Sequence, residues 1–95
     1  MDRDALQRLK RYMRVDHDDD DDLICRLWES SVEYLKNAGI DESSDPGLYW
    51  LAAAGLTLYW YDSNPFDSGT LESIPLGIRR VINQLKAKCG GLNYV

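Results

Sequence analysis

The sequence is poor in the residues that form metal, redox or covalent sites. Its 95 residues include one histidine, His17, and two cysteines, Cys25 and Cys89. A single histidine excludes histidine clusters and the H-E-x-x-H zinc motif. The cysteines lack C-x-x-C spacing, so we expect reduced thiols. A phosphate loop is also missing, because the glycines at 90 and 91 lack the lysine and following helix that it needs, and we predict no enzyme activity, no cofactor and no metal ion.

Long apolar runs are missing as well. No stretch approaches the roughly 20 residues that span a bilayer, and the N-terminus lacks the apolar core of a signal peptide. We therefore expect no membrane partner and synthesis in a cytoplasm. The 44% of hydrophobic residues still predicts a packed core, and the length is that of one small domain, residues 1–95.

The charges are segregated along the chain, whose net charge is -5. Residues 1–15 hold five basic and two acidic side chains, and residues 16–22 hold six aspartates. Residues 23–74 hold two basic against eight acidic side chains, whereas residues 75–95 hold four basic ones. Basic ends and an acidic middle would allow copies to pair head to tail, although an ordinary solvated surface explains the same counts.

Apolar spacing predicts two helices in the first part of the chain. Asp2 is placed to cap the first, and the basic side chains lie mostly off its apolar face of Ala5, Leu6, Leu9, Tyr12 and Met13. The second begins near Leu23, and its core-facing stripe is Leu23, Ile24, Leu27, Trp28, Val32 and Leu35. Residues 37–39 should end it, since glycine adopts the left-handed conformation easily.

Two further helices follow. Asp45 and Pro46 predict the start of a third helix through residue 62, apolar on nearly all sides and therefore central, with small residues at 52–55 that permit close packing. Pro75 opens a fourth, whose apolar side carries Ile78, Val81, Ile82 and Leu85 and which ends at Gly90. The fold class is all-α, a small bundle of about four helices. A long loop with a short strand near residues 69–74 precedes the last helix, and residues 89–95 form a mobile tail.

Five consecutive aspartates precede the second helix: Asp18, Asp19, Asp20, Asp21 and Asp22. The favoured interpretation is a capped helix start with a solvated acidic loop, because carboxylates near a helix N-terminus are stabilised by about 0.3 to 1 kcal/mol each. The remaining aspartates repel one another, and a positive charge nearby would relieve that repulsion. Two alternatives therefore stay open: a patch that binds a basic partner, and a weak cation site. A calcium loop is disfavoured, since the run lacks the alternating ligands and the glycine of that motif.

Two other patterns resemble nucleic-acid sites. The aromatic series Tyr49, Trp50, Tyr59, Trp60 and Tyr61 has almost no basic neighbours, so core packing explains it better than base stacking. The basic residues Arg79, Arg80, Lys86 and Lys88 are spaced like phosphate contacts on a recognition helix. The overall acidity argues against general DNA affinity, because DNA would be repelled.

Three segments together resemble the head-tail connector, or adaptor, proteins of long-tailed double-stranded DNA phages and prophages. The first is LQRLKRYMRVDHDDDDDLICRLWESSVEYLKNAGI, in which Met13 to Asp16 occupy a turn between a short and a long helix. The second is LYWLAAAGLTLYWYDSN, an apolar helix that ends in aromatics and a polar loop. The third is IPLGIRRVINQLK, the lead into the last helix. They follow in the family's order across residues 6–88.

The resemblance implies a structural subunit in the virion, at the interface of head and tail. Such subunits form a homo-oligomeric ring on the portal protein, contact a tail-side stopper or tail completion protein, and let double-stranded DNA pass without specific binding. The loop before the last helix and that helix itself are then the candidate assembly interface: Asp67, Ser68, Thr70, Glu72, Arg79, Arg80, Lys86 and Lys88. Arg79 and Arg80 would meet a neighbour's acidic middle, and Asp18 to Asp22 would face the channel or a partner.

Two other functions fit parts of the same pattern. The pI near 4.6 and the small size also suit an acidic inhibitor that mimics DNA and occupies a nucleic-acid-binding enzyme. The clustering of the aspartates in residues 16–22 argues against it, since mimicry needs carboxylates spread over one face. The basic residues at 79–88 alternatively suit a small helical DNA-binding packaging factor.

Overall fold

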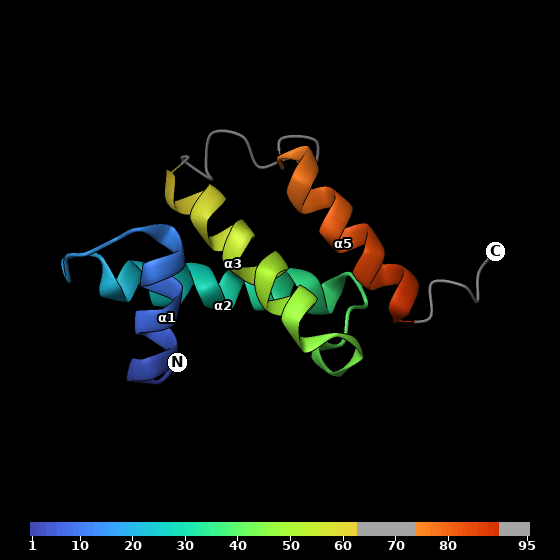
Figure 1. Cartoon of the computed structure of the whole chain (residues 1–95), viewed down its shortest axis with the longest axis horizontal. Coiled ribbons are helices and arrows are strands. Elements are labelled where there is room, and N and C mark those ends of the chain that lie inside the picture. The colour runs from blue at the N-terminus through green and yellow to red at the C-terminus, as the bar shows by residue number, and fades with distance from the viewer. Residues whose placement is uncertain (63–73, 90–95) are drawn as a thin grey trace.

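The structure, a computed structural model, describes residues 1–62 and 74–89. These ranges contain four α-helices, α1 (Arg3–Met13), α2 (Asp21–Asn37), α3 (Pro46–Asp62) and α5 (Leu76–Lys88), with a short 3-10 helix η1 (Glu42–Ser44) (Figure 1). They contain no strand, so the predicted all-α fold is confirmed. The predicted loop at residues 63–73, with nearly all of its short strand, lies outside the described residues.

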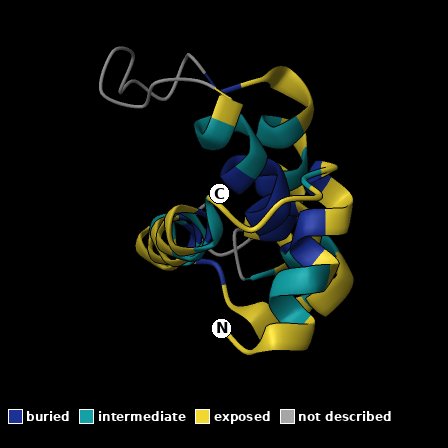
Figure 2. Cartoon of the chain, turned by 90° about the vertical axis from the view of Figure 1, so that its left-hand side faces the viewer, coloured by how far each residue is buried: buried dark blue, intermediate teal, exposed yellow. Residues whose placement is uncertain are grey.

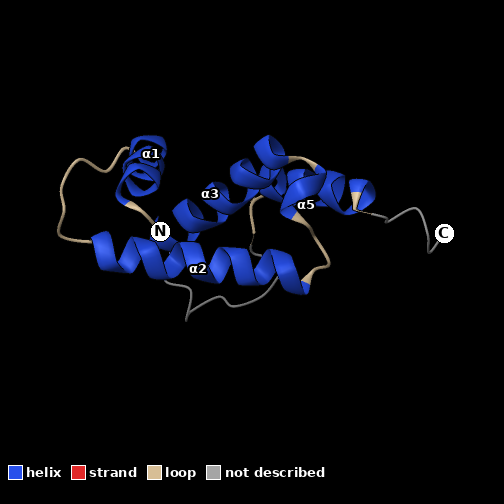
Figure 3. Ribbon diagram, turned by 90° about the horizontal axis from the view of Figure 1, so that it is seen from below, coloured by secondary structure: helices blue, strands red, loops and turns tan. Residues whose placement is uncertain are grey.

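α3 is the central helix, as its apolar sequence predicts. It packs against α2, α5, α1 and η1. Figure 3 shows two layers: α2 forms one, and α1, α3 and α5 lie together in the other. The buried residues lie where these layers meet (Figure 2). One core cluster joins α3 to α2 and α5 around Leu35, Leu56 and Leu85, and a second joins it to α1 and α2 around Leu9 and Ile24.

The local signals in the sequence set the helix ends. The Asp2 carboxylate accepts a hydrogen bond from the Ala5 N–H at 2.7 Å, and Asp45 accepts one from the Leu48 N–H at 3.2 Å. Both are the predicted caps. After α2, Gly39 has a φ of 82°, and the next amide donates back to the Leu35 carbonyl at 3.0 Å. This left-handed glycine ends the helix as expected.

Close packing of α3 on α5 depends on Gly55. A β-carbon at this position would lie 3.2 Å from Cγ1 of Ile78. The four small residues at 52–55 are all buried. The predicted close approach is therefore confirmed, with α5 as the neighbour.

Three predicted placements are wrong. Leu23 was expected in the core-facing stripe of α2 but is 47% exposed, because the stripe that faces α3 begins at Ile24. Lys10 was expected off the apolar face of α1 but is buried, since carboxylates meet its ammonium group. Cys89 was assigned to a mobile tail, yet it caps α5 and contacts the turn before α3. Residues 90–95 lie outside the described ranges.

The aromatic residues of α3 pack within the fold, as predicted. Tyr49 is buried in the first core cluster, and Tyr59 and Trp60 pack against it. Trp60 also meets Tyr34 of α2 edge to face, with ring centroids 6.1 Å apart. Edge-to-face pairs of this kind add about 0.5 to 1.5 kcal/mol beyond the area that they bury.

Candidate interaction surfaces

The aspartate run surrounds the ammonium group of Lys10. Nζ of Lys10 lies 2.7 Å from Oδ1 of Asp18 and 2.8 Å from Oδ1 of Asp21. The Lys10 side chain is only 4% exposed, whereas that of Asp18 is 83% exposed. A residue of α1 thus binds both the loop before α2 and the first turn of α2. We call this group of three residues the Lys10 clasp.

The charges of the clasp stabilise one another. Hydrogen bonding from Lys10 holds the pKa of Asp18 below its ordinary value, and the ammonium charge adds to the effect. The hydrogen bond to Asp18 and then the close contact with Asp21 raise the pKa of Lys10, against a smaller opposing effect of burial. The repulsion within the aspartate run is therefore offset by a cation of the same chain.

A third aspartate of the run, Asp20, is bound by a residue of α3. The Tyr61 hydroxyl donates a hydrogen bond to Oδ2 of Asp20, and this bond raises the pKa of Tyr61. Asp20 occupies the N-cap position of α2, but its side chain makes no capping bond. The prediction of a helix start is therefore correct, but the predicted side-chain cap is not formed. Asp18 is solvated as predicted although it pairs with Lys10, whereas Asp20 and Asp21 are partly buried. Asp19 and Asp22 remain exposed.

The basic residues of α5 divide into two groups. Arg80 and Lys86 are exposed and Arg79 is partly exposed. We call the part of α5 that carries these three residues its basic outer face. Lys88 instead reaches the loop before α3, where its Nζ lies 3.1 Å from Oδ2 of Asp45. The other predicted interface residues, Asp67, Ser68, Thr70 and Glu72, lie outside the described residues.

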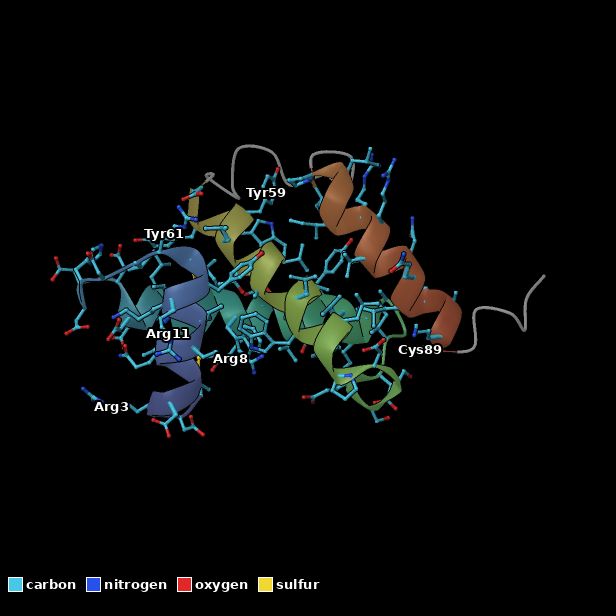
Figure 4. All side chains as sticks on the ribbon, viewed as in Figure 1. Arg3, Arg8, Arg11, Tyr59, Tyr61 and Cys89 are labelled. Carbon is cyan, nitrogen blue, oxygen red and sulfur yellow. The ribbon has the colours of Figure 1, made fainter. Side chains whose placement is uncertain are left out.

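Cys89 fixes the end of α5 to the turn around η1. Its sulfur accepts a hydrogen bond from the Asp41 N–H at 3.2 Å and lies 3.1 Å from the Ser44 hydroxyl oxygen. Figure 4 places Cys89 at the end of α5 beside this turn. Cys25 lies on α2, and the two cysteines form no disulfide with each other.

An apolar groove runs between α1 and α5, with α3 as its floor. One part has a volume of about 240 Å³ and is lined by Tyr12, Leu51, Ala52, Gly55, Pro75, Gly77, Ile78 and Val81. An adjoining part of about 250 Å³ extends the groove to Tyr59 and Asp62. Leu51 is 41% exposed at the groove. Helical periodicity could not reveal this surface, because residues from three helices form it.

An arginine lies beside the groove on an aromatic ring. The Arg8 guanidinium carbon is 4.2 Å from the centre of the Trp50 ring, and that ring meets Tyr12 edge to face at 5.5 Å. Figure 4 shows Arg8 on the side of α1 toward α3, whereas Arg3 projects away from it. No carboxylate of the described residues forms an ion pair with Arg8. A stacked guanidinium keeps its N–H edge available to a carboxylate.

Comparisons with protein-family models, with curated proteins and with solved structures found no match to this chain. Among residues 1–62 and 74–89, no helix is both long and apolar enough to cross a membrane. The same residues contain no cluster of histidine, cysteine and acidic side chains suited to a metal ion.

Proposed function

We propose that this protein is a head-tail connector subunit of a long-tailed phage or prophage. The observation that carries the proposal is the succession of three family-like segments, each of which coincides with a structural unit. The first segment covers most of α1, the turn at Arg14 and α2. The second covers most of α3, and the third leads into α5 and covers most of it. The all-helical fold is consistent with that resemblance.

In this proposal, subunits form a ring on the portal protein at the head-tail interface. The basic outer face of α5 docks on an acidic surface of the portal. Arg80 and Lys86 are suited to this role because they are exposed and form no ion pair with described residues. Tail-side proteins bind the other side of the ring, and double-stranded DNA passes through without specific contacts, because the net charge of -5 repels phosphates.

The two alternative functions gain less support. A DNA mimic needs many exposed carboxylates, but the Lys10 clasp neutralises part of the aspartate run. A DNA-binding factor needs the basic residues of α5, and Lys88 is held by Asp45. The connector role requires neither a phosphate-like array of carboxylates nor a fully basic helix.

Binding to the portal protein of the same phage or prophage tests the proposal. We expect the wild-type chain to sediment with assembled portal rings and the double variant Arg80→Glu/Lys86→Glu to bind at least tenfold more weakly, about 1.4 kcal/mol. Lys36→Glu is the matched control, since Lys36 is an exposed basic residue of α2, and it should bind as the wild type does. A wild-type chain that never sediments with the portal would overturn the proposed function.

A further inference from the structure

We infer that the apolar groove between α1 and α5 receives the start of α2 from a second copy of this chain, with Leu23 as the inserted side chain. The inference rests on the proposed function in one respect, because it names the contact by which connector subunits would meet. Three features of the described residues support it: the apolar character of both surfaces, the order of the charges along each, and the separation of the two surfaces on the molecule.

The first feature is the apolar character of both surfaces. Apart from Asp62 at one end, the groove is lined by aliphatic, aromatic and glycine residues over its two connected parts. Leu23 is one of the few large apolar side chains that the described surface exposes, at 47%. Leu51, at the groove, is another. Bringing the two together removes both from water, and the burial of apolar surface favours association.

The second feature is the order of charges along each surface. On α2, the exposed residues Asp19 and Asp22 precede Leu23, and the exposed Arg26 follows it by about one turn. Around the groove, Arg8 lies near the Leu51 end through its contact with Trp50, and Asp62 lines the opposite end. The aspartates of one copy therefore meet Arg8 of the next, while Arg26 meets Asp62.

The third feature is the separation of the two surfaces. The groove belongs to the layer of α1, α3 and α5, whereas Leu23 lies on α2, the other layer in Figure 3. One copy cannot fill its own groove, and the two patches are different surfaces. Such a contact is heterologous and repeats from copy to copy, as a ring or a chain requires. Extents of 46 × 30 Å leave room for the roughly 800 Å² per partner of a standard interface.

Absolute mass by light scattering after size exclusion, with the full chain alone over a concentration series, tests the inference. Leu23→Asp removes the inserted side chain and Leu51→Asp disrupts the groove. Both positions are exposed, and circular dichroism checks that each variant folds. We expect the wild-type mass to rise above 10.9 kDa with concentration and each variant to remain a monomer. An equal mixture of the two should form dimers and nothing larger, because it retains one intact groove and one intact Leu23.

Two further variants control for folding and for charge. Leu76→Asp alters an exposed leucine that is outside the groove lining and should associate as the wild type does. Arg8→Glu should weaken association at least tenfold, and adding Asp19→Arg should restore it. A wild-type chain that is monomeric throughout overturns the inference, as does a mixture that stays monomeric or a Leu23→Asp variant that associates normally. Portal binding is measured separately. If the chain fails to bind the portal, the connector function is contradicted, but a groove contact observed by light scattering is not.

Discussion

Lys10 is the residue that joins α1 to the start of α2. Its buried ammonium group lies between Asp18 and Asp21, and Leu9 beside it is fully buried. α1 is short and has few neighbours other than α3 and α2. Its position therefore depends on a small apolar contact together with one set of charges.

Replacing Lys10 with methionine should destabilise the fold in a pH-dependent manner. The pKa of Asp18 is lowered in the folded state, so its contribution is present above its ordinary value of 3.8 and is lost as the pH falls through the folded pKa. The raised pKa of Lys10 gives a contribution that is present below 10.5 and lost at higher pH. Lys10→Met should therefore lower the free energy of unfolding at pH 7 and have a smaller effect near pH 3, where the Asp18 contribution has begun to be lost.

Urea denaturation at the two pH values measures this effect. Arg11→Met is the control, because Arg11 is an exposed residue of α1 that forms no ion pair with described residues. It should change stability little at either pH. An equal loss at pH 7 and pH 3 for Lys10→Met would contradict the electrostatic role of the clasp.

Ser31 and Thr57 form a buried polar contact between α2 and α3. Their hydroxyl oxygens are 3.0 Å apart, and each also lies within hydrogen-bonding distance of a carbonyl of its own helix. We expect Ser31→Ala and Thr57→Val each to cost about 0.5 to 1.5 kcal/mol. The double variant should cost less than the sum by about 0.5 kcal/mol or more, since the shared bond is lost only once. Additive losses in a double-mutant cycle of unfolding free energies would show that the hydroxyls do not interact.

At the scale of elements, the close packing of α3 and α5 depends on Gly55, which has no side chain. Gly55→Val should destabilise the fold by about 1 to 3 kcal/mol, because its side chain would overlap Ile78. Ile78→Ala in the same chain should recover part of that loss. Gly77→Ala is the control: nothing lies within 4 Å of the added carbon, and it should be neutral or stabilise α5 by up to about 1 kcal/mol. Thermal unfolding measures all three, and equal destabilisation by Gly55→Val and Gly77→Ala would contradict the packing.

The helices and their caps could be predicted from the sequence because their causes are local. Asp2, Asp45 and Gly39 act on amides a few residues away, and an apolar period reports the buried face of a helix. Lys10 was misplaced because its burial depends on carboxylates of the next loop and helix, Asp18 and Asp21, which the spacing within α1 does not report. Leu23 was misplaced because the packing of α2 on the rest of the fold, and not the apolar period alone, decides which residue begins the buried stripe. The groove could not be predicted either, since Tyr12, Leu51 and Ile78 come from three different helices.

At the scale of the whole molecule, the two proposed contacts use different surfaces. The outer face of α5 would bind the portal through charges, whereas the groove and Leu23 would join neighbouring subunits largely through apolar contact. At physiological ionic strength, salt largely screens the interaction between exposed charges that are more than about 8 Å apart, and higher salt shortens this distance. We therefore expect an increase from about 0.05 to 0.5 M NaCl to weaken portal binding markedly and to affect self-association less. Sedimentation velocity at both salt concentrations measures the two effects, and an equal loss would contradict this division.

The mass of the assembled portal complex, measured by native mass spectrometry, tests the central claim most directly. The chain is proposed to be a ring-forming connector, so portal rings mixed with excess wild-type chain should gain one fixed integer multiple of 10.9 kDa. The multiple should stay constant as more chain is added, as expected of a closed ring. A portal mass that does not change, or a gain that keeps growing without a fixed multiple, would contradict the account.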